Sequence, residues 1–179
     1  MATRKKTTEL TRCSGTMTEA QYLAWIRSAL RSKWLRWPPR AEAIMAARRP
    51  YRGPNKLQKF EVQCAICKEW YKQKEVEVDH FPHDAGSIRS IDDIGPFVGR
   101  LYCEVTNLRV LCKPCHSCYT LSQSKGITFE EALLEKRVNE RMKDKNLLAY
   151  LAEHGYTGSS VSNATKRKQL VTSILRDAP

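Results

Sequence analysis

Apolar residues recur at helical spacing in several stretches of the chain, and this pattern predicts helices there. Thr18 and Gln21 form a capping-box pattern ahead of an apolar series that ends near Lys33. Thr128 and Glu131 open a second such series, which predicts a charged helix over residues 129–142. Further helices are expected over residues 40–48, 145–154 and 164–175.

Other stretches lack this period. The two prolines after Trp37 should break the first helix, because they remove backbone donors and push Trp37 out of the helical region. Alternating polar and apolar residues predict short strands over 59–63 and 74–78. Residues 84–105 show no sustained period, so we expect a long loop there with at most a turn of helix.

These elements predict an α+β fold in four segments. Residues 1–17 are polar and should form a disordered basic arm. A basic helical and aromatic extension is expected over 18–60, a central core over 61–125, and a helical basic region over 126–179.

Charge is unevenly distributed along the 179 residues, whose net charge is +12. Residues 1–60 hold 14 Lys and Arg against 3 Asp and Glu, residues 61–134 hold 8 against 11, and residues 135–179 hold 9 against 5. Solvated surface charge is the alternative, but so large and polarised an excess favours a nucleic-acid partner. No apolar run of about 18 residues and no signal-peptide pattern is present, so we expect no membrane partner and a cytoplasmic location.

Seven cysteines are many for a cytoplasmic chain unless some bind a metal. Two Cys-x-x-Cys pairs, Cys64 with Cys67 and Cys112 with Cys115, have the spacing of zinc knuckles. Disulfides or coincidence are the alternatives. Four thiolates leave zinc no open position, so this ion would be structural.

Polar residues of another kind lie between and beside these pairs: Asp79, His80, Asn107 and His116. An adjacent Asp and His at the end of a strand can place one side chain on a metal and the other on the water to be activated. Each residue alone is a weak signal, since such dipeptides are frequent and a lone Asn is most often in a turn. Together they indicate a hydrolytic site.

In combination these residues resemble the HNH nucleases with the ββα-metal fold, in the four-cysteine zinc form common in bacteriophage and homing-type enzymes. The matching motifs are Cys-x-x-Cys at 64–67, Val-Asp-His-Phe at 78–81, Asn-Leu-Arg-Val-Leu-Cys-x-x-Cys-His at 107–116, and Thr120. The resemblance covers residues 62–120, about a third of the chain. It implies a central zinc-stapled nuclease core with basic helical N- and C-terminal extensions.

The resemblance also implies a metal-dependent DNA endonuclease that hydrolyses phosphodiester bonds by nicking or double-strand cleavage. His80 would be the general base, a role that suits imidazole because its ordinary pKa is about 6.5. Asp79 and His116 would bind the catalytic Mg²⁺ or Mn²⁺. Asn107 would hold the loop bearing His80 and orient its ring. The segment between His80 and Asn107 is longer than the compact motif requires.

Three further residues near the motif or in the C-terminal region are expected to play no catalytic part. His83 and Cys118 should be bystanders, and His154 should be a surface residue at a helix C-terminus.

Basic residues outside the motif are candidates for phosphate contact, some of them interleaved with Trp34 and Trp37. The alternatives are a core role for the tryptophans and solvation for the arginines, including Arg109. The C-terminal helices resemble a SAP-type DNA module, although an ordinary helical hairpin that packs a leucine stripe explains its apolar residues equally well. The candidate DNA contacts are Arg36, Arg40, Arg48, Arg49, Arg52, Arg109, Lys166, Arg167 and Lys168.

Two other function classes compete with a nuclease. A non-catalytic zinc-stabilised module that binds DNA, or a phage packaging accessory with a protein partner, would explain the cysteines and the charge but not the four catalytic-type residues. A deaminase is set aside, because the chain lacks the His-x-Glu element. Duplex cleavage by one site would require a homodimer or two successive encounters, and a phage-encoded enzyme would act in the host cytoplasm.

Overall fold

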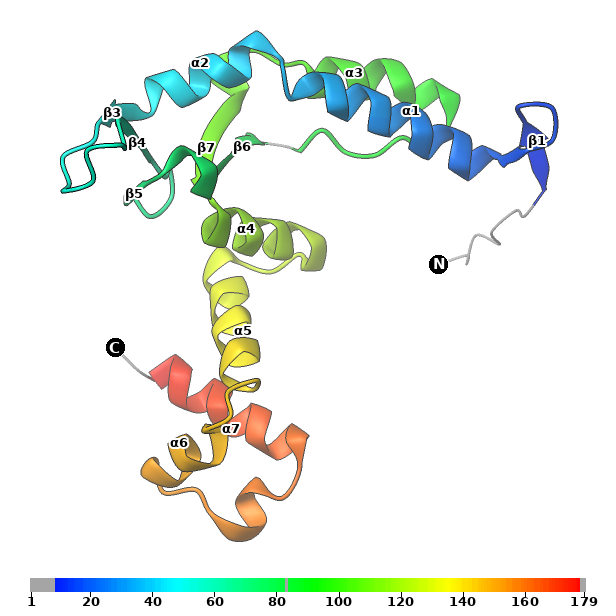
Figure 1. The fold of residues 1–179 in the computed structure, drawn as a ribbon. Coiled ribbons are helices and arrows are strands. Elements are labelled where there is room, and N and C mark those ends of the chain that lie inside the picture. Colours follow the sequence, from blue (N-terminus) through cyan, green and yellow to red (C-terminus); the bar gives the residue numbers. More distant parts are fainter. Residues whose placement is uncertain (1–8, 83, 178–179) are drawn as a thin grey trace. The chain divides into compact units, whose positions relative to one another are not determined.

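Helices and short antiparallel strands make up the chain in a computed structural model that describes residues 9–82 and 84–177 (Figure 1). The chain divides into a first unit, Met1–Lys113, and a second unit, Pro114–Pro179. All strands of the described residues belong to the first unit. The predicted α+β class is therefore confirmed.

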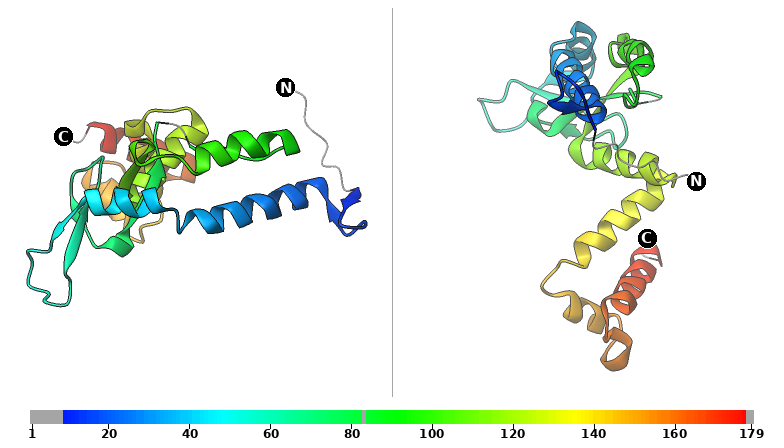
Figure 2. Two further views of the ribbon diagram at one scale, coloured as in Figure 1. Left: turned by 90° about the horizontal axis from the view of Figure 1, so that it is seen from above. Right: turned by 90° about the vertical axis from the view of Figure 1, so that its right-hand side faces the viewer.

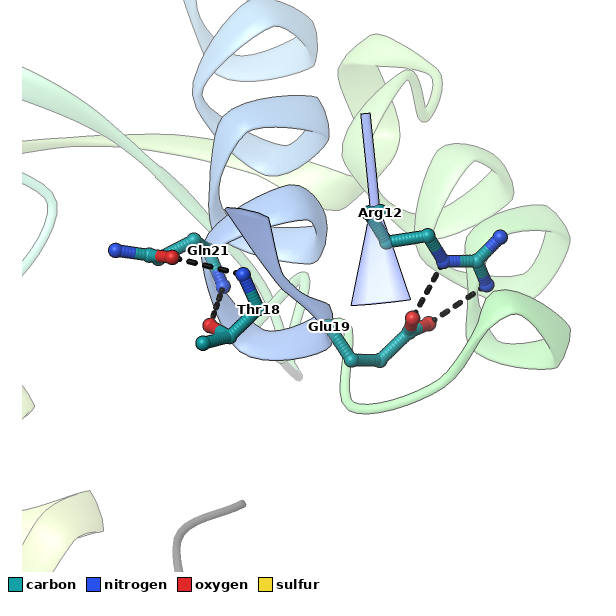
Figure 3. A network of polar contacts seen from close by, with 4 residues as sticks. All are labelled: Arg12, Thr18, Glu19 and Gln21. Carbon is teal, nitrogen blue, oxygen red and sulfur yellow. Dashed lines mark hydrogen bonds and ion pairs between the residues drawn. The ribbon is translucent and has the colours of Figure 1, made fainter. Parts of the chain in front are cut away.

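A small hairpin precedes the first helix, so the prediction of a disordered arm over 1–17 is wrong for its second half. Strand β1 (Leu10–Arg12) pairs with β2 (Met17–Thr18) through a turn that contains left-handed residues. The Arg12 guanidinium donates to both oxygens of Glu19, at 2.5 and 3.0 Å, and ties the hairpin to the helix (Figure 3). The first part of the arm, residues 1–8, lies outside the described residues.

The predicted capping box opens helix α1 (Glu19–Trp34). Gln21 N–H donates to Thr18 Oγ1 at 3.2 Å, and Thr18 N–H donates to the Gln21 side chain at 2.8 Å (Figure 3). These two bonds satisfy backbone donors that the first turn of a helix leaves without partners. The prediction for this helix is confirmed.

Helix α2 (Pro38–Ala46) follows after a break of three residues. Trp37 is extended, with φ −65° and ψ 125°, as expected for a residue before proline. The prolines occupy the first helical positions, where their missing N–H is not needed, so α2 begins two residues before the predicted range of 40–48.

The expected long loop over 84–105 contains a helix, α3 (Ile94–Leu101), which corrects the sequence prediction. Phe97 and Leu101 are fully buried on one face of it, against Leu23 of α1. Helices α1 and α3 run side by side in both views of Figure 2. The helical spacing of apolar residues is hard to recognise here, because α3 is short and contains Gly95, Pro96 and Gly99.

Five strands form two further sheets in the first unit. A three-stranded antiparallel sheet has the order β3-β4-β5, and a two-stranded sheet pairs β6 with β7. In β6 the buried residues alternate as Val76, Val78 and His80, and the two valines join the apolar core with Val110 and Ala43. The strands are β3 (Arg48–Pro50), β4 (Phe60–Gln63), β5 (Trp70–Tyr71), β6 (Val76–His80) and β7 (Leu108–Cys112).

The second unit is helical throughout its described residues. The predicted box at Thr128 is confirmed: Glu131 N–H donates to Thr128 Oγ1 at 3.1 Å, and the Glu131 side chain accepts from Thr128 N–H at 2.8 Å. Its core contains Val138, Leu147, Leu151 and Val171, whereas Leu148 of the predicted stripe is 53% exposed. The helices are α4 (Lys113–Lys125), α5 (Phe129–Arg141), α6 (Leu147–Glu153) and α7 (Ala164–Asp177).

Short 3₁₀ turns connect several of these elements: η1 (Gln73–Glu75), η2 (Ile91–Asp93), η3 (Val105–Asn107) and η4 (Gly158–Val161). None of the helices in the described part of the chain has the length and apolar character needed to cross a membrane.

Thr18→Ala should lower the free energy of unfolding by about 1 kcal/mol, because the Gln21 N–H loses its acceptor at the start of α1. Urea unfolding followed by circular dichroism measures this change. Thr18→Ser keeps the hydroxyl and is the control. Equal stability of the two variants would contradict a capping role for the hydroxyl.

Candidate functional site

The first cysteine pair lies on a tight turn directly after β4. Cys64 N–H donates to Glu69 O, and Lys68 N–H donates to Cys64 O, both at 3.0 Å. Lys68 closes the turn in the left-handed region, with φ 62°. The turn is fixed to β7 because Ala65 N–H donates to Val110 O at 2.8 Å.

The second pair joins the first in a four-cysteine cluster. Cys112 ends β7, Cys115 lies in the first turn of α4, and the four sulfur atoms lie within 4.8 Å of one another. Cys67 Sγ and Cys112 Sγ are 4.0 Å apart, close to the separation of about 3.8 Å that tetrahedral geometry with Zn–S bonds of about 2.3 Å requires. The predicted grouping is confirmed, and the donor set fits a structural metal ion such as zinc.

The surroundings of the cluster favour thiolates. Burial raises the pKa of Cys64, but hydrogen bonds from the backbone of Cys112, Cys67 and Ile66 outweigh burial and lower this pKa to about 7. Hydrogen bonding with Cys67, 3.4 Å away, raises the pKa of the Tyr71 phenol, which therefore stays protonated. Because a metal binds the deprotonated thiol, zinc affinity should fall as the pH drops below about 7.

His80, the predicted base, ends β6 and is buried, with 9% of its surface exposed. Its Nε2 lies 3.0 Å from Leu101 O, and its ring stacks on Trp34 with a centroid distance of 4.9 Å and an angle of 28°. A carbonyl oxygen can only accept a hydrogen bond, so Nε2 carries a proton, and in the neutral ring Nδ1 carries the lone pair. The ring is therefore held in one tautomer.

Asn107 braces the backbone directly after His80. Phe81 N–H donates to Asn107 O at 2.9 Å, and Asn107 Nδ2 donates to Phe81 O at 3.3 Å. These bonds fit the predicted role of Asn107 in holding the loop that bears His80. The imidazole itself donates to Leu101 O, a backbone acceptor that no side-chain motif could reveal.

Asp79 lies opposite Arg109 in the β6–β7 pairing. Arg109 donates from Nε and Nη2 to Asp79 Oδ2, at 3.2 and 3.0 Å, and its guanidinium lies 4.7 Å from the centroid of the Phe81 ring. The two side chains are only 15% and 12% exposed. Arg109 is therefore not the solvated residue that was one alternative.

Three further residues of interest lie in the helices of the second unit or next to them. His116 is half-buried in the first turn of α4, within the second unit, and its carbonyl accepts from Thr120 Oγ1 at 3.0 Å. Cys118 is buried in the same helix, and His154 follows α6 as an exposed capping residue, as expected. His83 lies outside the described residues.

A small surface pocket of about 240 Å³ lies beside His80. It is polar in part, since Arg100 and Asn107 contribute to its wall. Its lining residues are His80, Phe81, Pro82, Gly99, Arg100, Cys103 and Asn107. Helix α3, which the sequence did not predict, thus supplies one side of the space next to the candidate base.

The N-terminal arginines proposed for DNA contact fall into two groups. Arg36, Arg48 and Arg52 are exposed, and Arg48 also lies 4.4 Å from the centroid of the Phe60 ring. Arg49 is held by Glu61 at 2.7 Å and lies 3.7 Å from the Trp70 ring centroid, while Arg40 lies 5.3 Å from that of Trp34. The exposed group is the better placed for phosphate.

The basic cluster of the second unit is also partly engaged. Lys166 Nζ donates to Ser159 O at 3.1 Å, and Arg167 Nε donates to Val161 O at 2.7 Å, so both side chains pin η4 to the start of α7. Lys168 is exposed.

No family model, no curated protein and no solved structure matches the chain.

Cys67→Ser should remove the bound metal and lower the melting temperature, because three thiolates and a hydroxyl bind zinc far more weakly than four thiolates. Metal content by mass spectrometry should fall from about one ion per chain to near zero. Cys13→Ser is the matched control, since Cys13 is also exposed but lies in the N-terminal hairpin. Equal metal content in both variants would exclude this site.

Proposed function

We propose that the chain is a metal-dependent HNH-type DNA endonuclease, with β6, β7 and α4 as its ββα-metal core. The observation that carries this proposal is the environment of His80: a buried imidazole at a strand end, held in one tautomer by Leu101 O and braced through the Asn107–Phe81 bonds. A histidine with only a packing role has no need of a neighbouring asparagine that fixes the following peptide. The arrangement suits a general base.

The proposed base works through Nδ1. A water molecule attacks the phosphorus of a DNA phosphodiester, Nδ1 takes the proton of that water, and the bond to the leaving 3′ oxygen breaks. The imidazolium that results carries its charge between Leu101 O and the face of Trp34, both of which favour a cation.

Asp79 and His116 would hold the catalytic divalent ion, since a carboxylate with an imidazole is a donor set that Mg²⁺ or Mn²⁺ accepts. Such an ion, when bound, stabilises negative charge on the scissile phosphate and the leaving oxygen. Arg109 donates to Oδ2 of Asp79, so the ion would join a carboxylate that already has a cationic partner.

DNA is the proposed substrate because of the charge. The net charge of +12 is concentrated outside the central segment, and Arg36, Arg48 and Arg52 are exposed in the first unit. Phosphate contacts of this kind make binding depend steeply on salt concentration.

A second candidate, a non-catalytic zinc-stabilised DNA-binding or packaging module, is favoured by one observation. Asp79 is already neutralised by Arg109 in a largely buried pair, which would serve as a structural ion pair without any metal. The two functions differ in metal-dependent cleavage.

His80→Ala should abolish plasmid cleavage while leaving plasmid binding intact, because it removes the proposed base but none of the exposed arginines. Nicking and linearisation are measured on gels in EDTA, Mg²⁺ and Mn²⁺. His154→Ala, at an exposed histidine of the second unit, is the control. Binding by the wild type without cleavage under any metal condition would give the second candidate precedence.

Asn107→Ala should lower the cleavage rate roughly 10- to 100-fold, because small displacements of a catalytic group are that costly. The variant loses the bond to Phe81 O but keeps the backbone bond between Phe81 N–H and residue 107. Its rate at saturating plasmid is the measurement, and zinc content should be unchanged. A wild-type rate would mean that the side chain does not hold His80.

A further inference from the structure

Trp34, the last residue of α1, makes the principal ring contact of His80 in the first unit. The two rings stack at 4.9 Å and 28°. Trp34 also packs against both apolar clusters of this unit, the one around the β6–β7 pair and the one between α1 and α3. Its position is therefore set by packing on several sides.

The indole N–H of Trp34 is buried and makes no hydrogen bond within the described residues. An unbonded buried donor is unfavourable, so hydrogen bonding is not what places this ring. What the ring offers is its aromatic face, and that face is on His80.

Trp37 fixes the other contact of His80 indirectly. Its Nε1 donates to Cys103 O at 2.8 Å, and its ring meets Tyr102 edge-on at 5.3 Å. Tyr102 in turn donates from its hydroxyl to Leu30 O at 2.7 Å. These bonds tie the junction of α1 and α2 to residues 101–103, the segment whose Leu101 carbonyl binds His80 Nε2.

We propose that Trp34 and Trp37 are positioning residues for His80, so that the α1–α2 junction belongs to the active site and does more than bind DNA. The expected effect on cleavage rests on the proposed function, whereas the expected effect on the orientation of the His80 ring does not. Trp34 fixes the plane of the imidazole, and the segment held by Trp37 supplies Leu101 O, the acceptor that keeps a proton on Nε2. Without both, the ring could turn over and exchange Nδ1 for a carbon.

A charged group over the Trp34 ring supports the same conclusion. Arg40 of α2 has its guanidinium 5.3 Å from the Trp34 ring centroid, and it donates from Nη1 to Leu35 O at 3.3 Å. A cation over an aromatic ring stabilises that ring in place. The junction is thus ordered by its own contacts before any DNA is bound.

The test follows the ring nitrogens of His80 by NMR in the full-length, zinc-loaded chain with ¹⁵N-labelled histidine, the His80 signals being assigned from their loss in His80→Gln. Wild type should show the Nε2–H tautomer. Trp34→Leu should give a mixture of tautomers and a turnover number at least about tenfold lower, with little change in KM for plasmid. Trp34→Phe retains an aromatic face and should restore both readouts.

Trp25→Leu is the matched control, because Trp25 lies in the same helix but is 63% exposed. It should leave tautomer and turnover unchanged. Trp37→Phe is a milder second variant that removes the bond to Cys103 O but keeps an aromatic ring beside Tyr102. It should shift the tautomer equilibrium in the same direction even where Trp34→Leu loses its zinc or its fold.

The positioning role would be overturned if Trp34→Leu and Trp37→Phe both showed the single tautomer of the wild type. Absence of cleavage by the wild type would instead reject the nuclease function. In that case the tautomer measurement still decides whether these tryptophans orient His80.

Discussion

Antiparallel pairing between β6 and β7 runs without a shift from Val76 opposite Cys112 to His80 opposite Leu108. At one end this register places Cys112 beside the first knuckle, and at the other it places His80 against Leu101 and Asp79 against Arg109. A slip of one residue would turn every side chain to the opposite face. The four-cysteine cluster and the candidate site therefore depend on the same few hydrogen bonds, and a metal bound by the cysteines would stabilise the register from outside the strands.

The sequence predicts those parts of the molecule that depend on local pattern. Each of these motifs is contained in four consecutive residues, so the local sequence is enough to recognise it. They are the capping boxes at Thr18 and Thr128 and the two Cys-x-x-Cys pairs. Helix α3 escapes prediction because its two buried residues, Phe97 and Leu101, are surrounded by Gly and Pro that weaken the helical signal. The hairpin of β1 and β2 escapes because its strands are only three and two residues long, and the Arg12–Glu19 ion pair that joins it to α1 spans seven residues.

The candidate site could likewise be predicted only in part. Its residue types are visible in the sequence, but the groups that orient them are not. Leu101 O is a backbone atom 21 residues from His80, and Trp34 is 46 residues away in a segment where aromatic and basic residues suggest DNA contact equally well. In the structure Trp34 faces inward and Arg36 is exposed. Aromatic and guanidinium groups that alternate in this segment therefore differ in place: Trp34 packs against the core, and Arg36 lies at the surface.

The Asp79–Arg109 pair is the feature that links the two candidate functions. In a protein that only binds DNA, a largely buried pair of this kind is weak as a source of stability, because the cost of removing both charges from water offsets their attraction. In the proposed nuclease the same pair has a use: a phosphate offers Arg109 a second anion, and a divalent ion offers Asp79 a second cation. A phosphate and a divalent ion that bind together would each compensate one charge of this pair. We therefore expect the proposed nuclease to bind metal and DNA more tightly together than separately.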